Sequence, residues 1–379
     1  MKILHITSHL NLGGVTSYVL AVSKALRQRG HDVAIASGGG ARECQLDPLG
    51  VASWRVPLAT SAEFGPQVFA AGWRLAARLG REPVDLLHAH TRVGQVVADR
   101  LSRRLGVPYV ATWHGFFRSN LGRALWPCTG DVTVAISEPV RQHLLRDLRV
   151  PEARVRLIPN GIDPAPFAVP ADRSAQQQLR DRLRIPPQAR IIGTVARLVP
   201  SKGIEQFLHG LAAIRQTVPE ARGLIVGEGS SRRRLEALSA AIGIADAVHF
   251  AGWLPDTRAA LSLMDVFVFL PAEREGFGLS LLEAMASGRP IVAVNRGGGA
   301  PWLLQESQLS ALVEPGDPQQ LAAAVIAWLR NGEAACQAAG RARAVVRERF
   351  SLDRMTDQLE AVYLELTTRN ARLATRVAP

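Results

Sequence analysis

The chain has 379 residues, of which 47% are apolar and 21% are charged, so its composition is that of a packed globular protein and excludes a disordered or collagen-like chain. Cys44, Cys128 and Cys336 are far apart and no apolar run is long enough to cross a membrane, which together indicate a cytoplasmic protein without disulfides. The formal net charge is +12, so we expect an acidic partner.

Short β-branched runs alternate with amphipathic stretches along the chain, as in βαβ units that build a parallel sheet covered on both faces. In a first series, strands are expected at 3–7, 33–37, 84–88, 107–112 and 132–136, with helices near 15–29, 66–80, 92–105 and 138–147. In a second series, strands are expected at 191–195, 223–226, 248–250, 266–269 and 291–294, with helices near 203–217, 231–241, 279–287 and 317–330.

The segment 159–187 separates the two series, because it is rich in Pro, Asp and Arg and lacks a strand pattern. We therefore predict an α/β protein with two Rossmann-like, doubly wound parallel-sheet domains, over residues 1–165 and 166–352. Residues 353–379 have helical spacing and are expected to pack back on the N-terminal domain, although the spacing alone does not decide between the halves. Such sheets bind ligands at the carboxyl ends of their strands, which predicts a central cleft between the domains.

The strongest chemical signal follows the strand expected at 266–269, and it reads Glu275-Gly276-Phe277-Gly278-Leu279-Ser280-Leu281-Leu282-Glu283. Its glycines permit close backbone approach, and the N–H groups of residues 277–279 open a helix and can hold an anion. One carboxylate before the helix and another one turn inside it can bind hydroxyl groups on either side of a phosphate, as a nucleotide sugar would present them. A helix with two exposed acids is the structural alternative.

A pair of cations follows the strand expected at 191–195. Arg197 and Lys202 are five residues apart at the start of the next helix, and they can neutralise a departing nucleoside diphosphate. The alternative is that both are solvated surface cations in an arginine-rich chain. A Walker A loop is excluded, because its pattern does not occur.

Two glycine turns and one histidine also follow expected strands. Gly14 lies in a Gly-Gly turn after the first strand and Gly227 ends another strand, so both are candidates for the donor site. His114 follows the strand at 107–112 and can donate a hydrogen bond to a sugar hydroxyl, with a structural histidine as the alternative. His88 and His90 are interpreted as structural, because no third ligand stands at metal spacing.

These motifs, together with Trp113-His114-Gly115 and the run from Ile158 to Asp163, resemble the retaining glycosyltransferase family 4 over nearly the whole chain. The resemblance implies the two-domain GT-B fold, in which the second domain holds most of the nucleotide sugar and the first holds most of the acceptor. It also implies a transferase that moves a hexosyl unit to a hydroxyl group.

The resemblance assigns a role to each matched residue. It implies that Glu275 contacts the donor sugar, that Glu283 binds the ribose diol, and that Arg197 and Lys202 bind the diphosphate. Taken together with the residues at the strand ends and the helix start, it gives a candidate catalytic group of Arg197, Lys202, Glu275 and His114, and a candidate donor-binding group of Gly14, Gly227, Gly276, Phe277, Gly278, Leu279 and Glu283.

One position departs from the family pattern. In the glycine turn 297–302 the family often has an acid after the proline, whereas this chain has Trp302. We expect this change to affect sugar or base preference rather than to abolish activity.

We expect transfer without a metal or other cofactor, because no carboxylate pair suggests a metal site and the cations can neutralise the leaving group. The resemblance implies front-face displacement with retention of configuration.

The acceptor is predicted from basic and aromatic residues of the first half. In the helix near 66–81, Phe69, Trp73, Ala76 and Leu79 oppose Arg74, Arg78 and Arg81, and a second group comprises Phe116, Phe117, Arg118, Arg123 and Trp126. These patterns predict a saccharide or lipid-linked acceptor of cell-envelope polysaccharide, lipopolysaccharide or glycolipid synthesis, with peripheral association to an anionic membrane at the inner face of the plasma membrane. A helix that faces the core and exposes basic residues to solvent is the alternative.

Two other classes of protein remain open at this point. A GT-B-like epimerase or phosphorylase would share the diphosphate clamp and differ in whether it needs an acceptor. A basic nucleic-acid-binding protein would explain the charge, but it would leave the glycine turns unexplained and the chain has no known nucleic-acid-reading module, so no nucleic-acid partner is expected.

Overall fold

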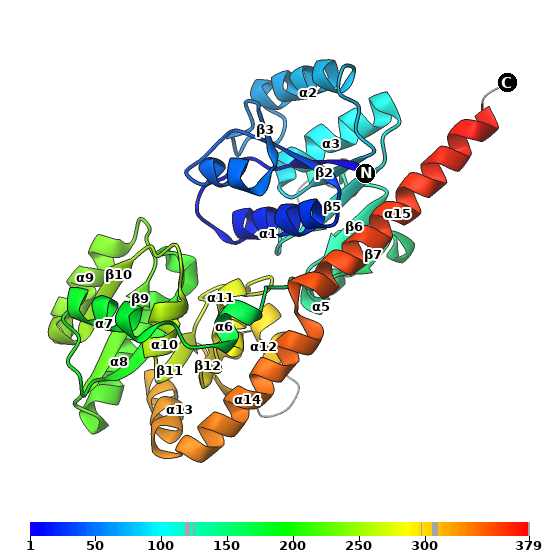
Figure 1. The fold of residues 1–379 in the computed structure, drawn as a ribbon. Coiled ribbons are helices and arrows are strands. Elements are labelled where there is room, and N and C mark those ends of the chain that lie inside the picture. Colours follow the sequence, from blue (N-terminus) through cyan, green and yellow to red (C-terminus); the bar gives the residue numbers. More distant parts are fainter. Residues whose placement is uncertain (118–121, 124–125, 297, 305–309, 378–379) are drawn as a thin grey trace. The chain divides into compact units, whose positions relative to one another are not determined.

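The structure is a computed structural model of the 379-residue chain, and it describes residues 1–117, 122–123, 126–296, 298–304 and 310–377. The chain forms two compact units (Figure 1). The first comprises Met1–Gly161 and Leu352–Pro379, and the second comprises Ile162–Ser351. The first unit therefore ends before the predicted boundary at residue 165, and the returning segment begins at Leu352 rather than at 353.

The first unit is built on a seven-stranded parallel sheet with the order β3-β2-β1-β4-β5-β6-β7. Its strands are β1 (Lys2–Ile6), β2 (Asp32–Ser37), β3 (Ala52–Arg55), β4 (Leu86–Ala89), β5 (Tyr109–Trp113), β6 (Val132–Ala135) and β7 (Val155–Leu157). Its helices include α1 (Gly14–Gln28), α2 (Pro66–Leu79), α3 (Arg92–Leu105), α5 (Glu138–Arg146) and α15 (Leu352–Val377).

The second unit is built on a six-stranded parallel sheet with the order β10-β9-β8-β11-β12-β13. Its strands are β8 (Arg190–Val195), β9 (Ala221–Val226), β10 (Val248–Gly252), β11 (Val266–Phe269), β12 (Ile291–Val294) and β13 (Ala311–Val313). Its helices are α6 (Ala165–Ala168), α7 (Arg173–Arg182), α8 (Ile204–Thr217), α9 (Arg232–Ala241), α10 (Arg258–Leu263), α11 (Leu279–Ala286), α12 (Gly299–Leu304), α13 (Pro318–Arg330) and α14 (Gly332–Arg349).

Both sheets are doubly wound, because each strand order reverses beside the first strand of its unit, β1 or β8. The central strands β4, β6, β11 and β12 are buried at every residue, which explains their nearly continuous apolar sequences. The predicted fold class, with two Rossmann-like parallel sheets, is confirmed.

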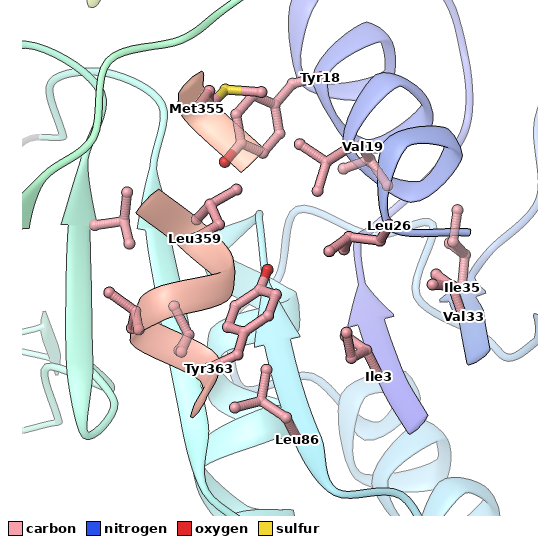
Figure 2. Close-up of a cluster of buried hydrophobic side chains, with 14 of the residues drawn as sticks. Ile3, Tyr18, Val19, Leu26, Val33, Ile35, Leu86, Met355, Leu359 and Tyr363 are labelled. Atoms are coloured by element: carbon pink, nitrogen blue, oxygen red, sulfur yellow. The ribbon is translucent and has the colours of Figure 1, made fainter. Parts of the chain in front are cut away.

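The helix α15 completes the core of the first unit. Its side chains Met355, Leu359 and Tyr363 lie among residues of α1 and the sheet, including Tyr18 and Ile3 (Figure 2). The helical spacing predicted for this segment is confirmed, and its partner is the first unit. Among the described residues, no helix is both long and apolar enough to cross a membrane.

Candidate active site

In the second unit, a short ion pair joins two of the motifs singled out in the sequence. Lys202 ends the short 3-10 turn Pro200–Lys202 after β8, and Glu275 lies in the loop after β11. Lys202 Nζ lies 2.6 Å from Glu275 Oε1, and the two side chains are only 20% and 23% exposed. The carboxyl ends of adjacent strands β8 and β11 therefore bring a cation and a carboxylate to one place.

Close backbone contact holds these two loops together. The N–H of Ala272 donates to Ser201 O at 2.9 Å. Gly203 has a φ of +68°, and a Cβ there would lie 1.7 Å from Leu270 O. Only glycine permits this approach, so Gly203 helps to build the site, although no role was predicted for it.

Glu275 has one unsatisfied oxygen. Its Oε2 is buried and has no hydrogen-bond partner among the described residues. Buried polar atoms are nearly always paired, because an unpaired one loses its water without replacement. A hydroxyl group of a ligand would satisfy this oxygen.

The helix α11 begins three residues after Gly276, and its first turn is open. Gly278 occupies the N-cap position, no side chain caps the helix, and no acidic residue lies in its first turn. The first N–H groups of a helix have no partner within the helix and carry partial positive charge, so the N-terminus at Leu279 can accept an anion. The side chain of Phe277 is 2% exposed, so this residue can offer a ligand only its backbone.

Glu283 lies on α11, one turn inside the helix, and has an unusual titration. Thr257, next to the start of α10, donates a hydrogen bond from Oγ1 to Glu283 Oε2 at 2.9 Å. Removal of the half-buried carboxylate from water raises the pKa of Glu283 to about 7, against the opposing effect of the Thr257 hydrogen bond. Thr257 was not predicted as a site residue, because a single threonine in a loop carries no motif.

Arg197 and Gly227 lie at the same side of the sheet as the Lys202–Glu275 ion pair, because they follow the carboxyl ends of β8 and β9. The Arg197 side chain is exposed and makes no hydrogen bond or ion pair within the described part of the chain. Of the two cations in this motif, Lys202 thus forms an ion pair with Glu275, whereas Arg197 has no ion-pair partner among the described residues. A Cβ at Gly227, where φ is +138°, would lie 1.9 Å from Ala196 O, so this glycine lets the two loops pack together.

The glycine turn before α12 packs against the same loop. The N–H of Gly299 donates to Glu275 O at 2.8 Å. Trp302 on α12 lies in an aromatic cluster with Phe277 and Phe350, with ring centroids 5.9–6.2 Å apart. Trp302 therefore supports the loop that carries Glu275. Gly297, the first residue of this turn in the sequence, lies outside the described residues.

In the first unit, Gly14 is the first residue of α1 and His114 directly follows β5. The His114 ring lies edge-on to Tyr18, with centroids 4.7 Å apart, and its Nε2 lies 3.4 Å from His90 Nδ1. Burial lowers the pKa of His114 to about 3, so its imidazole is neutral near pH 7.

His88 and His90 were interpreted as structural because the sequence shows no third ligand at metal spacing, and that premise is wrong in the folded chain. His5 of β1 lies beside them, and one ring nitrogen of each residue falls within 4.8 Å of the other two. Each histidine is fully buried, which lowers its pKa and keeps its ring neutral. The rings are already hydrogen-bonded, because His5 contacts His90 while His88 contacts Tyr363 and Thr112. Parallel pairing of β1 with β4 brings His5 opposite His88, which sequence spacing does not show.

The aromatic face predicted for α2 is partly wrong. The helix buries Val68, Ala71, Leu75 and Leu79, whereas Trp73 is 71% exposed beside the exposed Arg74. The apolar stripe toward the core is thus rotated away from Trp73.

In the second basic and aromatic group, Arg123 pairs with Glu63, and Trp126 Nε1 donates to Asp99 Oδ2 at 2.8 Å. Arg118 lies outside the described residues.

The chain matches two family models, one in each unit. Residues 12–166 match "Glycosyltransferase Family 4", and residues 175–345 match "Glycosyl transferases group 1". A D-inositol 3-phosphate glycosyltransferase from Acidothermus cellulolyticus is 29% identical, over 96% of this chain and 89% of that protein. The N-acetyl-alpha-D-glucosaminyl L-malate synthase of Bacillus anthracis is 25% identical, over 95% of this chain and 96% of that protein.

Solved structures share the fold. Anabaena Alr3699/HepE in complex with UDP-glucose aligns with a TM-score of 0.84 at 22% identity, and it covers 97% of this chain and 100% of that chain. WaaG, a glycosyltransferase involved in lipopolysaccharide biosynthesis, aligns with a TM-score of 0.74 at 16% identity, over 96% and 99% of the two chains.

The two parallel α/β units and their structural neighbours show the GT-B fold. Both family models that the chain matches describe glycosyltransferases. Since the two family models together extend from residue 12 to residue 345 with a short gap, the chain belongs to glycosyltransferase family 4.

Proposed function

We propose that this glycosyltransferase moves a hexosyl unit from a nucleoside-diphosphate sugar to an acceptor hydroxyl, with retention of anomeric configuration and without a divalent metal. The observation that carries the proposal is the unsatisfied Oε2 of Glu275. The other oxygen of this carboxylate pairs with the Lys202 ammonium, and the residue precedes the uncapped N-terminus of α11. A sugar hydroxyl would satisfy the carboxylate, while a diphosphate would bind the ammonium and the helix N-terminus.

The donor is assigned to the second unit. The Glu275 loop, with Gly276, Phe277 and Gly278, would hold the sugar and its phosphates, and Glu283 would accept hydrogen bonds from the ribose diol. Arg197 is exposed and available to the diphosphate, and Gly227 lets the loop after β9 approach. UDP-glucose in the Anabaena structure, which shares this fold, supports a nucleotide sugar as the donor.

The reaction would be a front-face displacement. The bond from the anomeric carbon to the diphosphate oxygen breaks, and the acceptor oxygen forms its bond to the same face. The acceptor proton passes to the departing phosphate oxygen. Lys202, Arg197 and the helix N-terminus would stabilise the charge that develops there, which is the task that a divalent ion performs in other transferases. His114 and Gly14 of the first unit are proposed to contact the donor.

The donor can be tested by thermal unfolding with a panel of nucleotide sugars. A donor at about 100 times its Kd should stabilise the protein by about 2.7 kcal/mol. Lys202→Ala and Glu283→Ala should abolish the shift, whereas Lys24→Ala and Glu333→Ala, which remove exposed charges elsewhere, should retain it. Absence of a shift with every nucleotide sugar would refute the donor assignment.

The reaction itself needs product analysis with and without acceptors. A glycoside that forms only with an acceptor, and keeps the donor's configuration at the anomeric carbon, is expected. An inverted product would refute the mechanism. Conversion of the donor without an acceptor would instead identify an epimerase, and dependence on inorganic phosphate would identify a phosphorylase.

We also propose a lipid-linked cell-envelope acceptor and peripheral association with an anionic membrane at its cytoplasmic face. The α2–α3 surface, defined by Trp73, Arg74, Arg81, Arg103 and Arg104, combines an exposed indole with exposed guanidinium groups. Indole rings favour the headgroup region, and each basic residue near an anionic surface contributes about 1 kcal/mol.

Vesicle sedimentation tests this surface. Binding to phosphatidylglycerol vesicles should exceed binding to phosphatidylcholine vesicles, weaken with salt, and fall in Trp73→Ala and Arg104→Gln. Trp253→Ala, which removes a 45% exposed tryptophan of the second unit, is the matched control. Binding that is weak and indifferent to lipid charge and salt would contradict the proposal.

A further inference from the structure

Three histidines of the first unit form a chain of imidazoles that ends at His114. His5 Nδ1 lies 2.8 Å from His90 Nε2, and His90 Nδ1 lies 3.4 Å from His114 Nε2. The three residues come from β1 and from the segments that follow β4 and β5. Each contact joins two ring nitrogens, so the position of one proton fixes the position of the next.

The rings at the inner end of the chain are neutral. Full burial lowers the pKa of His5 to about 3 and lowers that of His90 well below its usual range. A neutral imidazole has one N–H donor and one bare nitrogen. In a chain of neutral rings every hydrogen bond must therefore run in the same direction.

Two arrangements satisfy this rule. In the first, His5 Nδ1 donates to His90 Nε2, His90 Nδ1 donates to His114 Nε2, and His114 carries its proton on Nδ1. In the second, every bond is reversed and His5 carries its proton on Nε2.

The inner end of the chain distinguishes the two arrangements. His5 Nε2 is buried and has no hydrogen-bond partner among the described residues. The second arrangement would place an N–H group there without an acceptor, and buried N–H groups without a partner are rarer than buried acceptors without one. The first arrangement leaves only a lone pair unpaired.

The outer end of the chain can reach a ligand. His114 is half-buried, and its Nδ1 has no hydrogen-bond partner within the described part of the chain. A proton on Nδ1 would make this nitrogen a hydrogen-bond donor. A neutral imidazole with that proton would be a poor base at the same nitrogen.

We propose that His5 and His90 are positioning residues that hold His114 in the Nδ1–H tautomer, so that His114 donates a hydrogen bond to a ligand oxygen and does not act as a base. The identity of that ligand as a donor sugar rests on the proposed function. The tautomer does not, because it is a property of the unliganded protein.

Nitrogen-15 NMR of the full-length protein labelled at histidine tests the proposal directly. Wild-type His114 should show a protonated Nδ1 and an unprotonated Nε2, and His90 should show the same pattern. The signals can be assigned by single His→Gln substitutions. Protonation of His114 at Nε2 in the folded wild type would overturn the proposal, because the tautomer is measured in the unsubstituted protein and the variants serve only for assignment.

Two substitutions of His90 provide a second measurement. His90→Leu removes the donor to His114 and should produce a mixture of its tautomers, whereas His90→Gln supplies an amide N–H and should restore the Nδ1–H form at least in part. His88→Gln is the matched control, because His88 is also fully buried and packs against His90, but its ring nitrogens are hydrogen-bonded to Tyr363 and Thr112 rather than to a histidine of the chain. An unchanged His114 tautomer in folded His90→Leu would contradict the role of His90.

Elemental analysis separates this proposal from a metal site. Since His5, His88 and His90 place ring nitrogens within 4.8 Å of one another, a zinc ion is the competing explanation for the cluster. The purified protein is expected to contain no stoichiometric zinc. One zinc per chain, lost in His5→Gln, would overturn the hydrogen-bonded chain. Failure to transfer sugar with the Nδ1–H tautomer present would refute the proposed function alone.

Discussion

Thr257 Oγ1 donates a 2.9 Å hydrogen bond to Glu283 Oε2, and this contact joins a loop after β10 to the first turns of α11. The hydrogen bond stabilises the ionised carboxylate, while burial raises its pKa to about 7. Glu283 therefore changes its charge within the physiological pH range, at the position where a ribose diol is proposed to bind.

Donor affinity should fall as the pH drops below 7. The diol donates hydrogen bonds, so it binds the ionised form of Glu283 better and lowers its pKa in the complex. When the pH is below the pKa of Glu283 in the unliganded protein, this carboxyl group must lose its proton before the diol binds. Binding therefore weakens by up to about tenfold per pH unit. Calorimetric titration with nucleoside diphosphate at pH 5.5 to 8.5 measures this slope. Glu283→Gln should remove it, and the same slope in that variant would contradict the assignment.

Thr257→Val should shift the midpoint of that pH dependence upward. The substitution removes the hydrogen bond that lowers the pKa of Glu283 and leaves burial, which raises it. A hydrogen bond to a charged group contributes about 1.5–3 kcal/mol, equivalent to roughly one to two pH units. Thr257→Ser retains the hydroxyl and should restore the wild-type midpoint. A midpoint that does not move in Thr257→Val would show that this hydroxyl does not stabilise the carboxylate.

Lys202 and Glu275 should show strong energetic coupling. Their partly buried atoms are 2.6 Å apart, so a double-mutant cycle of Lys202→Met and Glu275→Gln should give a coupling of about 1–3 kcal/mol in urea unfolding. The exposed pair Arg78 and Glu82 is the control, with an expected coupling of about 0.3–0.5 kcal/mol. Equal coupling in the two cycles would mean that burial adds nothing to the Lys202–Glu275 pair.

Trp302→Ala should destabilise the second unit and weaken donor binding together. The indole contacts Phe277, whose loop carries Glu275, and also Phe350. Because Trp302 is only half-buried, we expect a loss of about 2 kcal/mol, below the 3–5 kcal/mol typical of a fully buried tryptophan. Trp302→Phe should retain most of the stability and the donor Kd. A wild-type Kd in folded Trp302→Ala would show that the cluster does not position the loop.

Acid should destabilise the first unit before it protonates the buried histidines. The pKa of His5 is about 6.5 in the unfolded chain and about 3 in the folded one. Between these two values the unfolded chain binds a proton that the folded chain does not bind. The contribution of His5 to stability is therefore complete above pH 6.5 and is lost as the pH falls toward 3. Within this window it contributes a slope of about 1.4 kcal/mol per pH unit. Urea unfolding at pH 5 and 7 should show a smaller difference in His5→Gln than in wild type. His209→Gln, which removes an exposed histidine, should leave the difference unchanged.

The sequence predicted the central elements well because their burial is uniform. β4 and β6 are buried at every residue and read as apolar runs, and the predicted helices of both series begin and end within a few residues of the observed ones. The strands β3, β7 and β13 were not predicted. Each is a short strand at the edge of its sheet, where partial exposure removes the continuous apolar signal.

The motifs of the site could be predicted from the sequence, but the contacts between their side chains could not. Lys202 and Glu275 were both identified, but their ion pair requires β8 and β11 to be neighbours, and sequence order does not show this. His5 and Thr257 were missed for the same reason, since each gains its role from a partner on another strand or helix. Helix periodicity also did not predict which face of α2 is buried, because alanines occupy both the buried and the exposed face of this helix.

The return of α15 to the first unit sets the order in which the protein can fold during synthesis. Residues 162–351 are contiguous and can form their core as soon as they leave the ribosome. The first unit, although translated earlier, lacks Leu359 and Tyr363 until all of those residues have been made. The half that emerges first is thus completed last. Until α15 has been made, the apolar side chains that it covers are exposed to chaperones and to other nascent chains. His88 Nδ1 also lacks its partner, the Tyr363 hydroxyl, during this time.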